Sequence, residues 1–239
     1  MLEAYALTDP GKVRTSNQDA FRLVPELGLF VLADGMGGAR GGERASALAV
    51  DCVTDVLARS SYRDAAALLG AVEEANQRVL KEAMRDARLE GMGTTLVAAL
   101  ETSAHDVAIA SVGDSRAYVL SHGNLRAITE DQTWVQEVGR NLGLDDESLR
   151  NHPMRHVLTM AVGVGTAIRI RYYAVELAPG DVMMLSSDGL HGVVANEEIE
   201  RILSAAPGSL EEMCRALVDA AHKAGSPDNV TVVLIRIAP

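Results

Sequence analysis

The sequence predicts an α+β sandwich with antiparallel sheets in the middle and helices outside, and three observations support this fold. Apolar runs of strand length follow one another with only short turns between them, which favours antiparallel pairing. Stretches with helical periodicity come in two pairs, one early and one late in the chain. Hydrophobic residues make up 48% of the 239 residues, which is enough for the core between such layers.

The first third of the chain predicts three strands and the first helix pair. Residues 3–9 and 20–24 have the pattern of short strands, and residues 27–33 form a continuous apolar run typical of a buried strand. Residues 42–59 place their apolar side chains on one helical face. The long stretch 63–89 has the same periodicity, so we expect it to be the second helix of the pair.

The middle of the chain predicts successive strands followed by a long polar segment. Turn signals lie at Ser103-Ala104, Gly113-Asp114 and His122-Gly-Asn124. The strands predicted around these turns are 93–100, 106–112, 115–121 and 124–129. Residues 133–165 are polar, and we expect them to be irregular or short-helical.

The last third predicts two strands, the second helix pair and a closing strand. Ser209 and Glu212 form a capping-box pattern at the start of the last helix. The predicted strands are 168–177, 181–187 and 229–237, and the predicted helices are 196–204 and 209–223.

Composition limits the partners and the compartment. The formal net charge is −11 and the sequence has no basic run, so nucleic acid and anionic membranes are not expected partners. Cys52 and Cys214 are expected to be buried reduced thiols. No apolar run approaches membrane-spanning length and no leader pattern opens the sequence, so we expect a cytoplasmic location. Without a linker or repeat, residues 1–239 are expected to form one domain, and we expect a monomer.

Three aspartates lie where an apolar, strand-like run begins or ends. Asp34 and Asp188 follow such runs, and Asp228 precedes one. A Gly or Asn beside each aspartate lets the backbone turn sharply and lets a ligand approach closely. An Asp-Gly after an apolar run is most often a hairpin turn, so plain turn or cap roles stay as the alternative. Together the three sites predict a carboxylate cage for hard cations such as Mg²⁺ or Mn²⁺.

Six short motifs occur in order between residues 14 and 229. They are Arg14-Thr-Ser-Asn-Gln-Asp19, Ala33-Asp34-Gly-Met-Gly-Gly38, Gly93-Thr-Thr95, Gly113-Asp114-Ser-Arg116, Ser187-Asp188-Gly-Leu190 and Asp228-Asn229. In this order they resemble the metal-dependent serine/threonine protein phosphatases of type 2C, in particular the small bacterial members. The resemblance implies a four-layer α/β/β/α sandwich, with two central antiparallel β-sheets flanked by antiparallel helix pairs. It also implies a single catalytic domain with a flap at about 133–165 beside the active site.

The resemblance assigns metal ligands within these motifs. Asp34 would bridge two Mg²⁺ or Mn²⁺ ions, and the Gly35 carbonyl would help to hold one of them. Asp188 and Asp228 would hold the other ion. Asp114 would bind a weaker third ion, although Gly113-Asp114-Ser-Arg116 is also a good hairpin sequence. A hydroxide bridging two ions can attack phosphorus directly, so no phosphoenzyme is expected.

Two further residues have roles implied by the resemblance. Arg14 would grip the substrate phosphate, which suits a planar bidentate donor. Asp19 would orient metal-bound water through a hydrogen bond. The alternatives are an ordinary surface arginine for Arg14 and a turn residue for Asp19, which follows Asn17-Gln18.

The general acid is the open point of this site. Members of the family carry a histidine at one of two positions that here hold Met36 and Ala39. A metal-bound water or His191 could protonate the leaving group instead. For His191, a structural position at the start of a helix is the favoured interpretation.

The function implied is hydrolysis of phosphoserine and phosphothreonine in proteins, opposing a bacterial Ser/Thr kinase. One rival is a catalytically weak phosphoprotein-binding regulatory module of the same fold. A second is a two-metal phosphodiesterase or nuclease, against which the acidic surface and the single phosphate-gripping arginine argue.

Overall fold

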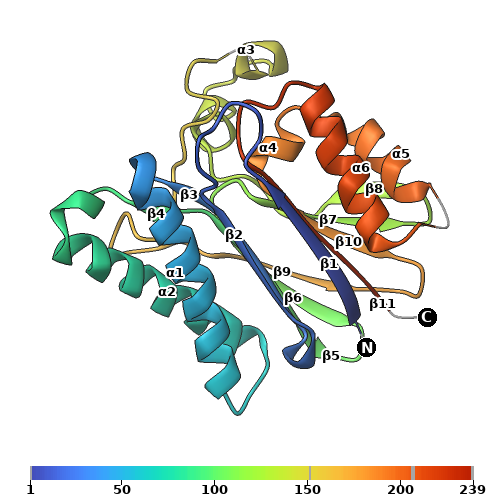
Figure 1. Cartoon of the computed structure of the whole chain (residues 1–239), viewed down its shortest axis with the longest axis horizontal. Coiled ribbons are helices and arrows are strands. Elements are labelled where there is room, and N and C mark those ends of the chain that lie inside the picture. The colour runs from blue at the N-terminus through green and yellow to red at the C-terminus, as the bar shows by residue number, and fades with distance from the viewer. Residues whose placement is uncertain (1, 151, 206–207, 238–239) are drawn as a thin grey trace.

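The computed structural model describes residues 2–150, 152–205 and 208–237, and within them it shows two antiparallel sheets packed face to face (Figure 1). The first is a five-stranded sheet in the order β1-β11-β10-β7-β8. Its strands are β1 (Leu2–Asp9), β7 (Arg116–Ser121), β8 (Asn124–Ala127), β10 (Val182–Ser186) and β11 (Val230–Ile237). Because β1 pairs with β11 from Leu2↔Ile237 to Asp9↔Val230, the beginning and end of the chain lie side by side.

The second sheet has six strands, in the order β2-β3-β5-β6-β9, with the short β4 paired to the end of β3. Its strands are β2 (Asp19–Val24), β3 (Leu29–Met36), β4 (Gly93–Thr94), β5 (Leu96–Ser103), β6 (Asp106–Val112) and β9 (Arg171–Glu176). Strand β3 is buried on both faces. Phe30 and Leu32 pack between the sheets, whereas Val31 and Ala33 face the helices. The continuous apolar run of this strand follows from that double burial.

Two helix pairs cover the outer faces (Figure 1). Helices α1 (Gly38–Arg59) and α2 (Ala65–Arg85) pack against the six-stranded sheet through a core that includes Val53, Val72 and Val79. Helices α5 (Asn196–Ser204) and α6 (Leu210–Lys223) cover the five-stranded sheet. The predicted capping box of Ser209 and Glu212 is present at the start of α6. The four-layer α/β/β/α sandwich is therefore confirmed.

Several predicted boundaries differ from the structure. The predicted strand 93–100 is divided at Thr95 into β4 and β5; Thr95 Oγ1 accepts from the Asp34 N–H and shares a hydrogen bond with Ser115 Oγ. The predicted helix 63–89 ends at Arg85, and a 3₁₀ turn, η2 (Ala87–Leu89), begins beyond Asp86. The predicted strand 168–177 is shorter, because only Arg171–Glu176 pairs with β6.

Residues 133–165 contain a π-helical turn, η3 (Val135–Gly139), and the short helix α3 (Asp146–Arg150). Two isolated bridges join this segment to itself and to the sheet, Thr133↔Leu158 and Thr94↔Val162. We call residues 133–165 the flap. Both Cys52 and Cys214 are buried free thiols, as expected. Across the described residues, every helix is too short or too polar to cross a bilayer.

Candidate metal centre and active site

Asp19 and Asp34 lie directly opposite each other on the neighbouring strands β2 and β3. Opposed residues of an antiparallel pair place their side chains on the same face, about 5 Å apart at Cβ. Two like charges in that position destabilise the sheet unless something neutralises them. The strand register therefore builds the first half of a carboxylate cluster at one end of the sandwich.

The Asp19 carboxylate is held by hydroxyl groups from the other sheet. Ser187 Oγ and Thr231 Oγ1 donate hydrogen bonds to its Oδ2, at 2.8 and 2.6 Å. Its Oδ1 is buried and has no hydrogen-bond partner among the described residues. Burial raises the pKa of Asp19 to about 6, against the opposing effect of the Thr231 and Ser187 hydrogen bonds. The side chain is fixed in position, with one oxygen left to interact with a ligand.

Asp34 owes its position to Thr94 and Thr95. The Asp34 N–H donates to Thr95 Oγ1 at 2.9 Å, and the Asp34 carbonyl accepts from the Thr94 hydroxyl at 2.8 Å. Burial raises the pKa of the Asp34 carboxyl well above its usual range, and nearby carboxylates raise it further. These carboxylates belong to Asp19, Asp188, Asp114 and Asp228.

Gly35, next in the chain, lies where no side chain fits. A Cβ at Gly35 would come within 2.1 Å of the Gly42 carbonyl oxygen. Its own N–H donates to the Gln18 carbonyl at 3.1 Å. Close contact between the end of β3 and the start of α1 thus requires glycine at this position.

Asp188 is the first residue of the short helix α4 (Asp188–His191), directly after β10. Its Oδ1 is buried without a hydrogen-bond partner among the described residues. Burial raises the pKa of Asp188, and the Asp228 charge adds to the rise. Gly189 packs so closely that a Cβ there would lie 1.9 Å from the Asn229 carbonyl oxygen, which fixes α4 against the start of β11.

Asp228 is half-buried and has a cationic partner. Arg14 Nη2 donates to its Oδ2 at 2.6 Å. Asn229 holds the loop that carries Arg14, because its amide donates to the carbonyls of Pro10 and Ser16 at 2.9 and 3.0 Å. The structure thus brings Arg14 to the cluster and pairs it with a candidate metal ligand.

Asp114 lies in the turn between β6 and β7, after Gly113 at φ +94°. Gln132 fixes this turn, since its Oε1 accepts from the Gly113 N–H at 2.8 Å. Burial, followed by the Asp188 charge, raises the pKa of Asp114 to about 8. Asp114 is therefore within electrostatic range of the other carboxylates.

The donor set suits hard divalent cations. Only oxygen ligands gather here, and two of them, Asp19 Oδ1 and Asp188 Oδ1, are buried without partners. In the part of the chain that the structure describes, no three His, Cys, Asp or Glu side chains are arranged to hold an ion by themselves. The two findings agree if protein carboxylates supply only part of each coordination shell, with a backbone carbonyl and water supplying the rest, as is usual for Mg²⁺.

The histidine considered as a general acid is placed away from this role. His191 is half-buried, and its Nδ1 shares a hydrogen bond with Ser186 Oγ at 2.9 Å. Desolvation and the Arg116 charge lower the pKa of His191 well below its usual value, which disfavours the protonated form that a general acid needs. Met36, paired with Gly93, has no proton to give. The side chain of Ala39 lies outside the described part of the chain.

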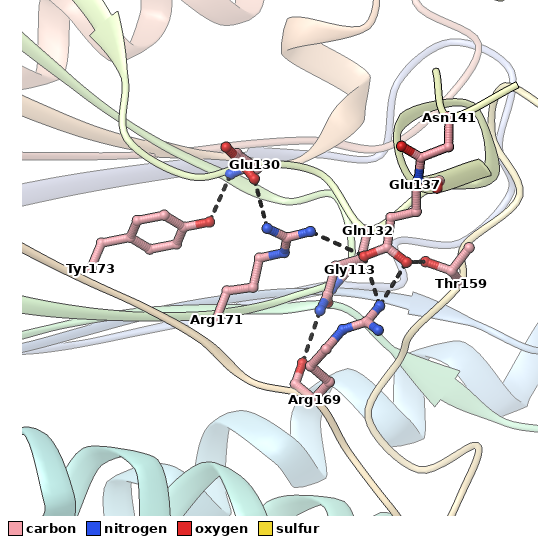
Figure 2. A network of polar contacts seen from close by, with 9 residues as sticks. All are labelled: Gly113, Glu130, Gln132, Glu137, Asn141, Thr159, Arg169, Arg171 and Tyr173. Carbon is pink, nitrogen blue, oxygen red and sulfur yellow. Dashed lines mark hydrogen bonds and ion pairs between the residues drawn. The ribbon is translucent and has the colours of Figure 1, made fainter. Parts of the chain in front are cut away.

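The flap is anchored beside this cluster by a polar network (Figure 2). Glu137, in the π-helical turn, accepts from Arg169 and Arg171 of the strand region and from the Thr159 hydroxyl. Gln132 Nε2 donates to the Arg169 carbonyl at 2.9 Å. A cavity of about 530 Å³ separates the flap from the cluster and reaches both Asp114 and Asp188. The predicted flap thus lies next to the predicted site.

Comparison with known proteins decides the family. A family model described as "Protein phosphatase 2C" matches residues 12–225. The chain belongs to the protein phosphatase 2C family. It is 35% identical to the serine/threonine phosphatase stp of Listeria welshimeri, over 98% of this chain and 96% of that protein.

Solved structures of the phosphatase 2C family agree with this assignment. The crystal structure of the Mycobacterium tuberculosis serine/threonine phosphatase PstP/Ppp matches with a TM-score of 0.91 and 33% identity, covering 100% of this chain and 99% of that one. The catalytic domain of PstP in complex with two manganese ions matches with a TM-score of 0.88 and 32% identity, and the match covers 100% of this chain and 99% of that one. The comparisons confirm the resemblance to type 2C phosphatases that the sequence motifs indicated. They also confirm the predicted enzyme class, phosphoprotein phosphatase.

Several residues of this phosphatase 2C site were not predicted. Ser187, Thr231 and Thr95 orient Asp19 and Asp34, and their position within or beside the motifs was the available signal. Gln132 and Glu137 lie outside the motifs, and the sequence carries no signal for their roles.

Proposed function

We propose that this phosphatase 2C member hydrolyses phosphoserine and phosphothreonine in proteins, with two Mg²⁺ or Mn²⁺ ions and, at lower affinity, a third. The observation that carries the proposal is the cluster of Asp19, Asp34, Asp114 and Asp188. Burial raises the pKa of each, and the charge of a neighbouring carboxylate adds to the rise in each case; for Asp188 that neighbour is Asp228. Such a cluster is costly without cations and suits them when they bind.

Each protein residue has a distinct task in this proposal. Asp34, the Gly35 carbonyl and Asp188 hold the ions, with Asp228 as a further ligand. The ions, when bound, supply a nucleophilic water at neutral pH and neutralise charge on the phosphoryl oxygens, so phosphorus is attacked directly. Asp19, fixed by Ser187 and Thr231, orients water beside them.

Arg14 binds the phosphate oxygens in the proposed reaction. It lies in an exposed position at the edge of the cluster, where a phosphoresidue arriving from solvent meets it first. The guanidinium fork matches two phosphate oxygens, so it can turn from Asp228 to the substrate. No side chain in this proposal forms a covalent intermediate.

Release of phosphate from a phosphothreonine peptide tests the proposal. We expect turnover with Mn²⁺, none in excess chelator, and none with Asp34→Asn prepared in the same way. The Asp34→Asn control separates activity of this chain from a contaminating phosphatase. Full activity in chelator, or in Asp34→Asn, would overturn the metal mechanism.

The rival regulatory module predicts a different result in the same assay. Such a module would bind the phosphopeptide and release no phosphate with any divalent ion. The intact oxygen cluster and the two orphan carboxylate oxygens favour turnover. We further propose that residues 1–239 act as one monomeric catalytic domain in the cytoplasm and oppose a Ser/Thr kinase. Adding the phosphatase to proteins phosphorylated by that kinase should remove their phosphate, which tests whether the two enzymes act on the same substrates.

A further inference from the structure

The cavity between the flap and the metal centre has two chemically different ends. Its inner end is formed by Asp114 and Asp188, the residues assigned to ion binding. Its outer part is lined by Arg140, Arg155 and His156, all from the flap and all exposed. We call Arg140 and Arg155 the rim; in a chain of net charge −11, two arginines grouped on one cavity are unexpected.

The two arginines have no ion-pair partner within the described residues, unlike the arginine deeper in the cavity. Arg116 is bound in bidentate fashion by Asp131, with both nitrogen–oxygen distances at 2.7 Å. That pair is neutral as a unit and leaves no charge to offer a ligand. Arg140 and Arg155 line the cavity without an ion pair to any described residue, so their charges can act on a ligand.

His156 follows Arg155 in the chain and lines the same cavity as Asp188. The flap arginines and the carboxylates assigned to ion binding therefore face one shared space. A substrate whose phosphate is bound at the ions can therefore place a second negative group of the same molecule at the rim.

The backbone that carries the rim is fixed on both sides. The π-helical turn before Arg140 is held by Glu137 through Arg169, Arg171 and Thr159 (Figure 2). On the other side, the Trp134 ring stacks on His152 with 4.4 Å between centroids, and the Arg155 N–H donates to the His152 carbonyl. A fixed backbone at these positions means that less of the loop has to become ordered when an anion binds.

We propose that this cavity binds a second anionic group of the substrate, a carboxylate or another phosphate close in sequence to the phosphoresidue being hydrolysed. This inference rests on the proposed function and specifies its substrate class. A spherical cavity of this volume is about 10 Å across, a distance that an extended peptide covers in about three residues. The preferred substrates thus carry an acidic or phosphorylated residue within about three positions of the target.

Three phosphothreonine peptides of one length test the selectivity. The first has neutral flanks, the second carries glutamates at three positions on either side, and the third carries one neighbouring phosphoserine. Two exposed ion pairs of ordinary strength should raise kcat/KM for acidic peptides about two- to thirtyfold over the neutral one. A larger rise with phosphoserine than with glutamate identifies phosphate as the preferred anion.

The variant Arg140→Gln/Arg155→Gln should bring the ratio of acidic to neutral kcat/KM close to one. The matched control is Arg85→Gln, an exposed arginine in the last turn of α2 that does not line the cavity; it should keep the wild-type ratio. Using a ratio removes any general loss of stability or metal binding from the comparison. A wild-type ratio near one, or an unchanged ratio in the double variant, would overturn the inference.

Salt gives a second test that needs no variant. Screening lengths fall from about 10 Å at 0.1 M to about 3 Å at 1 M, so the preference should decline with added salt. A preference that persists unchanged in high salt would contradict a charge-based site. Manganese-dependent hydrolysis of the neutral peptide reports the proposed function separately, so failure of the selectivity and failure of the phosphatase activity are distinguishable.

Discussion

The Arg14 guanidinium lies 2.6 Å from the Asp228 carboxylate, across 214 positions of sequence. The pair joins the proposed phosphate ligand to a proposed metal ligand, so substrate and metal binding share one edge of the site. Asn229 fixes the position of Arg14 relative to Asp228, because it holds the loop on which Arg14 lies.

Arg14→Ala should mainly raise KM for a phosphopeptide, with a smaller fall in kcat. The reason is that an arginine bound to the phosphate in both ground and transition states contributes mostly uniform binding. Steady-state kinetics at saturating Mn²⁺ measure both constants, and Arg22→Ala, an exposed arginine paired with Asp51, is the control. Unchanged kcat and KM in Arg14→Ala would show that the assignment is wrong.

Asp34→Asn and Asp188→Asn should abolish turnover, because each removes charge from the ion-binding centre. In chelator, however, Asp34→Asn should melt at a higher temperature than the wild type. Its pKa is raised by burial and by neighbouring carboxylates, so replacing the charge with an isosteric amide relieves repulsion in the folded state. Calorimetry in EDTA checks this, and a lower melting temperature for Asp34→Asn would contradict the electrostatic account.

Without divalent ions, stability should fall as pH rises from about 4 to about 8. The pKa values of Asp19 and Asp114 in the folded protein are about 6 and about 8, above the ordinary 3.8. A raised folded-state pKa means that the folded protein binds more protons in this range, so the free energy of unfolding declines with pH. Melting temperatures measured in EDTA across this range test the sign, and Asp114→Asn should flatten the slope.

Millimolar Mn²⁺ should raise the melting temperature, most strongly at the alkaline end of that range. Ions bind the deprotonated carboxylates of the folded state, and at one hundred times Kd this stabilises by about 2.7 kcal/mol. For a chain of this length the shift is about 5–10 °C. Equal melting temperatures with Mn²⁺ and with EDTA at pH 8 would count against the metal centre.

Glu137→Gln should destabilise the flap's attachment to β9. The carboxylate is only 18% exposed and binds Arg169, Arg171 and Thr159, so its loss should cost about 1–2 kcal/mol and lower the melting temperature by about 3–6 °C. The control is Glu211→Gln, whose exposed pair with Arg215 on α6 should contribute almost nothing. Similar melting temperatures for both variants would remove Glu137 from any anchoring role.

The sequence predicted the layers and the carboxylate positions because both depend on local patterns. The double burial of β3 shows in its unbroken apolar run, and Asp34 and Asp188 follow directly from the ends of such runs. The division of the strand at Thr95 did not show locally, because the residues that Thr95 Oγ1 contacts, Asp34 and Ser115, lie 61 and 20 positions away in the sequence.

Contacts between distant segments account for the rest of what the sequence did not predict. The π-helical form of Val135–Gly139 accompanies Glu137 contacts with arginines more than thirty residues away. Likewise, Thr231 orients Asp19 across 212 positions, and no motif spacing encodes that bond. The rim of Arg140 and Arg155 became visible only with the cavity that they line.

The pairing of β1 with β11 has a consequence for how the enzyme is made. Strand β11 lies between β1 and β10, so the five-stranded sheet cannot form until β11 has been synthesised. Thr231 positions Asp19 and Asp228 positions Arg14, so neither side chain is in place until this part of the chain has been synthesised. Contacts of such long sequence separation form slowly. A chain halted before residue 228 would therefore carry Arg14, Asp19 and Asp34 yet lack the residues that position Arg14 and Asp19, so we expect it to be inactive.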